Sequence, residues 1–139
     1  MELLVLDTSV VLKWFSEESH SGAALKIRDD FYKGLCGIVV PDLLLYEFSN
    51  ALRYNQNYTP EDVNKAVVSL FELQIDIVVP TIEILTDSAD LARKYDIAVY
   101  DAVFVALAKS LGAVFVTADE KLHSRIKELK FVRSIADFK

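Results

Sequence analysis

Short runs of apolar residues recur along the chain, separated by longer stretches with helical spacing. The runs lie at residues 3–6, 38–40, 75–79 and 114–116, with a weaker one at 131–132. Continuous apolar runs of this length are typical of strands buried on both faces, as in a parallel sheet. We therefore predict five short strands joined by helices.

The stretches between the runs predict the helices. Apolar residues at helical spacing place helices near residues 10–15, 23–31 and 42–55. The segment Thr59-Pro60-Glu61-Asp62 is typical of a helix start. The apolar face that follows it is predicted to contain Val63, Val67, Leu70 and Phe71.

Two further helices and a last short one complete the pattern. Pro80-Thr81 opens a helix whose apolar stripe is predicted to be Ile82, Leu85, Ala89 and Ala92. Residues 102–111 are apolar almost all round and stop at Gly112, which predicts a central, buried helix. A short helix is expected at residues 122–129. Strands alternating with helices predict a three-layer α/β/α sandwich with a mostly parallel central sheet, built as a single domain over residues 1–139.

Composition narrows the functional classes. The 139 residues are 53% apolar, and 15 Lys and Arg against 21 Asp and Glu give a net charge of −6. This balance argues against a protein that coats nucleic acid through a broad basic surface. Cys36 is the single cysteine, which excludes a disulfide scaffold and fits a reducing cytoplasm. We expect a cytoplasmic protein, because the sequence has no signal-peptide pattern and no apolar run of the ~18 residues needed to span a membrane.

The charge is unevenly distributed along the chain. Residues 121–139 carry six basic and two acidic groups, whereas the other 120 residues carry nine basic and nineteen acidic groups. Two interpretations are open: a solvated basic helix face, or a local contact surface for phosphates beside an acidic centre.

Acidic residues follow the predicted strands, where ligands bind in open α/β sheets. Asp7 follows the first strand, and Asp119 follows the strand at 114–116. Asp101 is expected to start the buried helix. Taken alone, each of these aspartates is better explained as an ordinary helix cap. Glu47 differs, because it lies within an apolar helical stretch and needs a partner, either a cation such as Arg53 or a metal.

Taken together, these acids favour a metal site. Four carboxylates at one sheet edge would repel one another, and a hard divalent cation relieves that repulsion. Oxygen ligands are those that Mg²⁺ or Mn²⁺ selects, and one or two such ions suit phosphodiester hydrolysis by activating water. Other chemistries lack their motifs: there is no His-Glu-x-x-His pair, no Gly-x-Ser-x-Gly elbow and no glycine-rich phosphate loop.

Four segments then resemble those of a known family, in the same order along the chain. They are residues 5–14 (VLDTSVVLKW), 41–52 (PDLLLYEFSNAL), 100–108 (YDAVFVALA) and 116–122 (VTADEKL). Together they resemble the PIN-domain ribonucleases, in particular those of the VapC toxin type. A single Asp-Thr-Ser motif would carry little weight, but four ordered segments cover nearly the whole chain.

The resemblance implies a Mg²⁺- or Mn²⁺-dependent endoribonuclease, the toxin of a toxin–antitoxin pair, that leaves a 5′-phosphate and a 3′-hydroxyl. It implies that the metal ligands are Asp7, Glu47, Asp101 and Asp119. The expected supporting residues around them are Thr117, Thr8, Ser9 and Asn50, and the expected RNA-backbone contacts are Lys121, Arg125 and Lys127. The family further implies a homodimer and a protein antitoxin, for which Trp14, Phe15 and Phe31 are candidate contacts unless they belong to the core.

Three alternatives stay open from the sequence. A phosphatase of the haloacid-dehalogenase type also has an aspartate after its first strand, but it needs a second aspartate where Ser9 stands. A response-regulator receiver would need a phosphoacceptor after the middle strand, which here ends in Val79-Pro80. The third alternative is a PIN-like binding module without catalytic activity.

Overall fold

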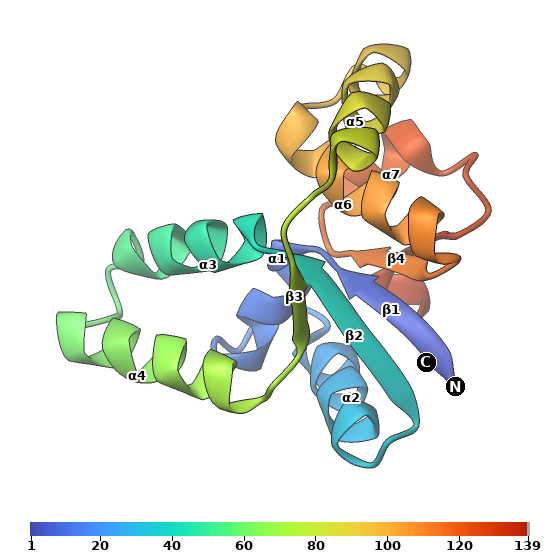
Figure 1. Ribbon diagram of the computed structural model, residues 1–139. Coiled ribbons are helices and arrows are strands. Elements are labelled where there is room, and N and C mark those ends of the chain that lie inside the picture. Colours follow the sequence, from blue (N-terminus) through green and yellow to red (C-terminus); the bar gives the residue numbers. More distant parts are fainter. Residues whose placement is uncertain (139) are drawn as a thin grey trace.

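The computed structural model describes residues 1–138 and contains one five-stranded sheet (Figure 1). The strands are β1 (Glu2–Leu6), β2 (Cys36–Pro41), β3 (Asp76–Val78), β4 (Val114–Thr117) and β5 (Val132–Ser134). All neighbours are parallel, in the order β3-β2-β1-β4-β5. The α/β fold class predicted from the apolar runs is therefore confirmed.

Seven α-helices and two short 3₁₀ helices connect the strands in this part of the chain. They are α1 (Thr8–Val11), η1 (Leu12–Trp14), α2 (Ser21–Tyr32), α3 (Leu43–Arg53), α4 (Pro60–Glu72), α5 (Ile82–Tyr95), α6 (Val99–Leu111), α7 (Glu120–Ile126) and η2 (Ile135–Asp137). In Figure 1, α3 and α4 form a hairpin that extends to one side of the sheet, and α5–α7 gather on the other side. None of the helices described over residues 1–138 has the length and apolar character needed to cross a membrane.

The sheet is covered on both faces. Successive residues of a strand point to opposite faces, and Leu4, Val5 and Leu6 are all buried. The same holds for Phe115 and Val116 in β4. Helix α6 packs against β1, β2 and β4, and α2 packs against β2. Burial of consecutive strand residues is the physical reason for the continuous apolar runs in the sequence.

The central helix follows the prediction closely. All residues from Ala102 to Ala108 are buried. Gly112 ends α6 with φ of +63°, a left-handed conformation that glycine adopts without steric cost. The helix begins earlier than predicted, however. Ala98 is its N-cap, so Asp101 lies within the first turn instead of starting the helix.

Two predicted helix faces are wrong in part. On α4, Leu70 is buried and Val63 and Val67 pack against the core as predicted, but Phe71 is 54% exposed. On α5, Ala92 packs against the core as predicted, but Ile82, Leu85 and Ala89 are exposed, while Ser88 and Leu91 are buried. Ser88 can lie on the core face of α5 because its hydroxyl donates to the Ile84 carbonyl at 2.6 Å, within the same helix. A polar residue can therefore occupy the core face, which an apolar pattern does not anticipate.

The aromatic residues considered for a partner surface belong largely to the core. Trp14 is buried and donates its indole N–H to the Ala24 carbonyl at 2.8 Å. Phe15 packs edge-on against Phe48 with ring centroids 5.2 Å apart. Phe31 is partly buried against the core. These side chains hold the early helices in place.

Candidate functional site

The four expected metal ligands come from four different elements. Asp7 follows β1, Glu47 lies on α3, Asp101 on the first turn of α6, and Asp119 precedes α7. We call this set the acidic cluster. Its members influence one another electrostatically: the charges of Asp7, Glu47 and Asp119 all raise the pKa of Asp101. Residues up to 112 positions apart in the chain therefore meet at the carboxyl ends of the central strands.

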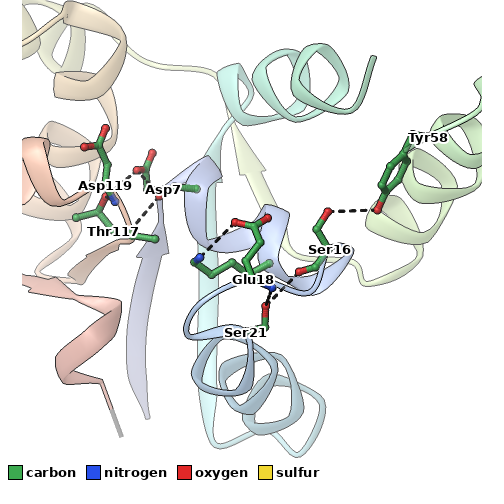
Figure 2. A network of polar contacts seen from close by, with 10 residues as sticks. Asp7, Ser16, Glu18, Ser21, Tyr58, Thr117 and Asp119 are labelled. Atoms are coloured by element: carbon green, nitrogen blue, oxygen red, sulfur yellow. Dashed lines mark hydrogen bonds and ion pairs between the residues drawn. The ribbon is translucent and has the colours of Figure 1, made fainter. Parts of the chain in front are cut away.

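Asp7 is the most buried member of the acidic cluster, with 6% of the residue exposed. It is the N-cap of α1 by position, but its side chain makes no capping hydrogen bond. Ser9 and Thr117 both donate to the same carboxylate oxygen, Oδ2, at 2.7 Å. Figure 2 shows Asp7 at the end of β1 with Thr117 beneath it and Asp119 nearby. The cap interpretation therefore fails for Asp7, whose carboxylate is oriented by hydroxyl groups instead.

The protons of these two hydroxyls are committed to Asp7. Thr117 Oγ1 accepts from the Asp119 backbone N–H at 3.0 Å, and Ser9 Oγ accepts from the Ala118 backbone N–H at 3.0 Å. Each hydroxyl has a single proton and accepts from a backbone donor, so its proton is directed to Asp7. The arrangement binds the end of β1 to the turn after β4 and fixes the orientation of the carboxylate.

Ser9 occupies the position where a phosphatase of the haloacid-dehalogenase type needs a second aspartate. Here its hydroxyl bridges the Asp7 carboxylate and the backbone after β4. This serine orients Asp7 and cannot replace the second carboxylate that such a phosphatase needs, so the position argues against that alternative.

Glu47 is held by a residue of α1. Thr8 donates its hydroxyl to Glu47 Oε1 at 2.7 Å, and Thr8 itself is buried. Arg53, the expected cationic partner, instead stacks over the Tyr54 ring at 4.5 Å. Asn50 is exposed, and among residues 1–138 no hydrogen bond joins it to Glu47. The support of Glu47 therefore comes from α1 and not from its own helix.

Asp119 does cap a helix. Its Oδ1 accepts from the Leu122 backbone N–H at 3.0 Å, which satisfies a donor in the first turn of α7. The capping interpretation and the metal-ligand interpretation are compatible here, because a carboxylate has a second oxygen. The cap holds an exposed side chain in one place beside Asp7.

Burial raises the pKa of three members of the acidic cluster. Desolvation is the largest cause for Asp7, Glu47 and Asp101, and for Asp101 the pKa rises to about 6. Two hydroxyl donors oppose the effect at Asp7, and the Thr8 hydroxyl opposes it at Glu47. Among residues 1–138, no ion pair joins any member of the acidic cluster to a Lys, Arg or His. The repulsion between these carboxylates is thus left for a bound cation to relieve.

The donor set fits a hard divalent cation. It consists of carboxylate oxygens, the ligands preferred by Mg²⁺ and Mn²⁺, and their anionic forms are disfavoured without added positive charge. Over residues 1–138, no group of three or more His, Cys, Asp or Glu side chains is drawn together as a preformed metal centre. The acidic cluster therefore fits a divalent cation because its side chains are carboxylates and because they repel one another, and not because they already form a coordination site.

The expected RNA contacts divide into two groups. Lys121 and Arg125 line a pocket of about 360 Å³ together with Asp101 and Asp119. Lys127 is exposed at the end of α7 and does not line it. A cavity of about 480 Å³ is lined by Glu2 and Cys36, the first residues of β1 and β2, and so lies at the opposite ends of these strands from the acidic cluster.

Comparison with known proteins places the chain in a recognised family. Residues 4–129 match the sequence pattern of the PIN domain. Ribonuclease VapC3 of Pyrobaculum aerophilum is 27% identical over 130 residues, covering 91% of this chain and 96% of that protein. The matched region includes every member of the acidic cluster.

Solved structures share the fold. The VapBC-1 structure from nontypeable Haemophilus influenzae gives a TM-score of 0.68 at 21% identity, covering 97% of this chain and 99% of the other. Mycobacterium tuberculosis VapC20, described as a sarcin-ricin loop cleaving toxin, gives 0.64 at 13% identity, covering 83% and 87%. At these identities the similarity is one of fold.

Proposed function

Because this chain belongs to the PIN domain family, we propose that it is an endoribonuclease that uses Mg²⁺ or Mn²⁺ to hydrolyse RNA phosphodiester bonds. The observation that carries the proposal is the acidic cluster: four carboxylates from four elements, mutually repelling and without a cationic partner in residues 1–138. Uncompensated acids held together cost stability, and here Asp7 is buried while Glu47 and Asp101 are half-buried, so the presence of the cluster is best explained by a function that needs it.

Each residue of the proposed site has a distinct task. Asp7, Asp101, Asp119 and Glu47 would hold one or two ions. When bound, a divalent ion supplies charge stabilisation at the phosphate and lowers the pKa of water. Ser9 and Thr117 orient the Asp7 carboxylate, and Thr8 orients that of Glu47. Because these hydroxyls donate to the carboxylates of Asp7 and Glu47, they favour the ionised form of each carboxylate, which is the form that binds a cation.

The proposal extends to the biological role. We propose that the protein is the toxin of a VapBC-type pair, bound and inhibited by a protein antitoxin. The relative named ribonuclease VapC3 and the VapBC-1 structure support this. A homodimer and a cytoplasmic location belong to the same proposal, as in the VapC-type proteins that the sequence resembles.

RNA cleavage by the purified protein tests the activity. Wild type should cleave one or more members of a panel of structured RNAs in Mn²⁺ and not in EDTA. Asp7→Asn and Asp101→Asn should lose at least about 100-fold in rate, since each removes a charged ligand. Asp90→Asn, an exposed change on α5, is the matched control and should retain activity.

The outcomes separate the proposed enzyme from a binding module without activity. Equal cleavage by wild type and both site variants would trace the activity to a contaminant and overturn the proposal. No cleavage with any metal and any RNA would favour the silent module. In that case calorimetry with Mn²⁺ shows whether the acidic cluster still binds the ion.

A further inference from the structure

A pocket lined by both acidic and basic side chains opens beside the acidic cluster. It lies between the loop joining α5 to α6 and helix α7, and its volume is about 360 Å³. Three acids, Asp96, Asp101 and Asp119, line it together with the bases Lys121 and Arg125. Ile97 and Leu122 add apolar surface. The volume is within the range of small-ligand sites, which runs from roughly 300 to 1,000 Å³.

The two basic side chains lie on the same side of α7. They are four residues apart, so they share one helical face. That face is the one turned to the pocket, since both residues line it. Lys127, only two residues beyond Arg125, does not. Of the basic residues in the segment 121–138, Lys121 and Arg125 are therefore the two that line this pocket.

Arg125 is held in a defined orientation by Asp96. Its Nη1 donates to the Asp96 backbone carbonyl at 2.6 Å and to the Asp96 carboxylate at 2.9 Å. Asp96 is the C-cap of α5 and has the left-handed conformation, with φ of +54°. Within residues 1–138, Nε and Nη2 of Arg125 donate to no other residue, so these N–H groups remain for a ligand.

A second contact also joins the end of α5 to the region of α7. Tyr95 donates its hydroxyl to Glu128 Oε1 at 2.6 Å, joining the end of α5 to the segment after α7. Figure 1 shows α7 beside the α5–α6 pair. The pocket is therefore bounded by elements that are bound to each other.

These features together describe a site for a nucleotide. An anionic phosphate suits Lys121 and Arg125, because a guanidinium binds phosphate through several N–H groups. A base or sugar suits the apolar surface of Ile97 and Leu122. Asp101 and Asp119 repel a phosphate unless a cation is bound beside them. The phosphate of a bound nucleotide is therefore expected to lie toward Lys121 and Arg125.

We propose that this pocket binds the nucleotide next to the cleaved phosphodiester, with Lys121 and Arg125 contacting its phosphate and Asp96 positioning Arg125. The inference rests on the proposed ribonuclease function for the identity of the ligand. It assigns selectivity for the flanking nucleotide to the α5–α6 loop and α7, because direct contacts to a base in single-stranded RNA determine sequence preference.

Nucleotide binding tests the pocket without requiring activity. Adenosine and uridine 5′-monophosphate are titrated into the ¹⁵N-labelled wild-type protein with Mg²⁺, with inorganic phosphate as the reference. Amide resonances of Ile97, Ala98 and Leu122 should shift, and the nucleotides should bind more tightly than phosphate. Shifts confined to other regions, or equal binding of phosphate and nucleotides, would overturn the proposal even if RNA is cleaved.

Kinetics of RNA cleavage provide the second test. Lys121→Ala and Arg125→Ala should each raise KM about tenfold, with kcat changed much less, because the lost contact is a charge-assisted hydrogen bond outside the reacting centre. Lys130→Ala removes the same charge at an exposed position outside the pocket and should change KM less than about twofold. Equal effects of Lys130→Ala and Arg125→Ala would mean that only overall charge matters, and would contradict the pocket.

The positioning role of Asp96 has its own readout. Asp96→Ala should raise KM with kcat retained, and Asp96→Asn should recover part of the loss because its side-chain oxygen still accepts from Arg125. An unchanged KM in Asp96→Ala would contradict this role. If no RNA is cleaved but the nucleotides bind the pocket, the ribonuclease proposal fails while the nucleotide site stands.

Discussion

Neutralising Asp101 should stabilise the protein in the absence of metal. Burial and the charges of its neighbours raise the pKa of this carboxyl from 3.8 to about 6. Between these values the folded state binds more protons than the unfolded chain, so stability falls as the pH rises through this window. The full shift corresponds to ~3 kcal/mol at neutral pH. Because the side chain is partly exposed, we expect a contribution of about 1–2 kcal/mol after solvent screening.

Urea unfolding of Asp101→Asn measures this directly. In EDTA at neutral pH, the variant should have a free energy of unfolding about 1–2 kcal/mol above wild type. The fall in stability that we expect for wild type between about pH 4 and 6 should be smaller in the variant. Wild type should gain ~2.7 kcal/mol from Mn²⁺ at 100 times its dissociation constant, and the variant should gain much less.

The control is Asp90→Asn, which makes the same chemical change at an exposed position of α5. It should match wild type within about 0.5 kcal/mol with and without Mn²⁺. Equal stability of Asp101→Asn and wild type in EDTA would refute the repulsion argument. Equal stabilisation of both by Mn²⁺ would refute the role of Asp101 as a ligand.

Three other predictions concern the support of the acidic cluster and its pH dependence. Thr8→Val removes the 2.7 Å hydrogen bond to Glu47 and should weaken Mn²⁺ binding at least about tenfold by calorimetry, whereas Thr8→Ser should restore it; equal binding by all three would contradict the role of Thr8. Thr117→Val should lower the free energy of urea unfolding by about 1–3 kcal/mol, because the buried Asp7 carboxylate and the Asp119 N–H both lose a partner; unchanged stability would show that water or another group replaces the hydroxyl. Lowering the pH through about 6 should weaken Mn²⁺ binding, because a proton then competes for Asp101; an affinity that is constant across this range would place the ion elsewhere.

The sequence pattern predicts the strands well for a physical reason. A strand covered on both faces must be apolar at every position, so its apolar run marks its bounds to within one or two residues. Helix faces are harder to predict. Ser88 occupies the core face of α5 by bonding its own helix, and the apolar residues Ile82 and Leu85 lie outside.

The acids of the site are predictable from the sequence, but their supports are only partly so. Asp7 and Asp119 follow strands, and the topology of a parallel sheet brings strand ends together. Asn50 is among the supporting residues expected from the sequence, yet the hydrogen bond to Glu47 comes from Thr8, on a different helix. The Asp96–Arg125 contact joins residues 29 positions apart and leaves no local signal, so the pocket emerges only from the fold.

The most direct test of the central claim is the position of Mn²⁺ in crystals of the wild-type protein soaked with the ion. Anomalous scattering locates Mn²⁺ independently of any assumption about ligands. The strongest peak should lie among the carboxylates of Asp7, Asp101 and Asp119, within ~2.0–2.3 Å of their oxygens, and it should be absent from Asp101→Asn. A strongest peak elsewhere, or none near these carboxylates at saturating Mn²⁺, would contradict the metal site on which the proposed ribonuclease activity depends.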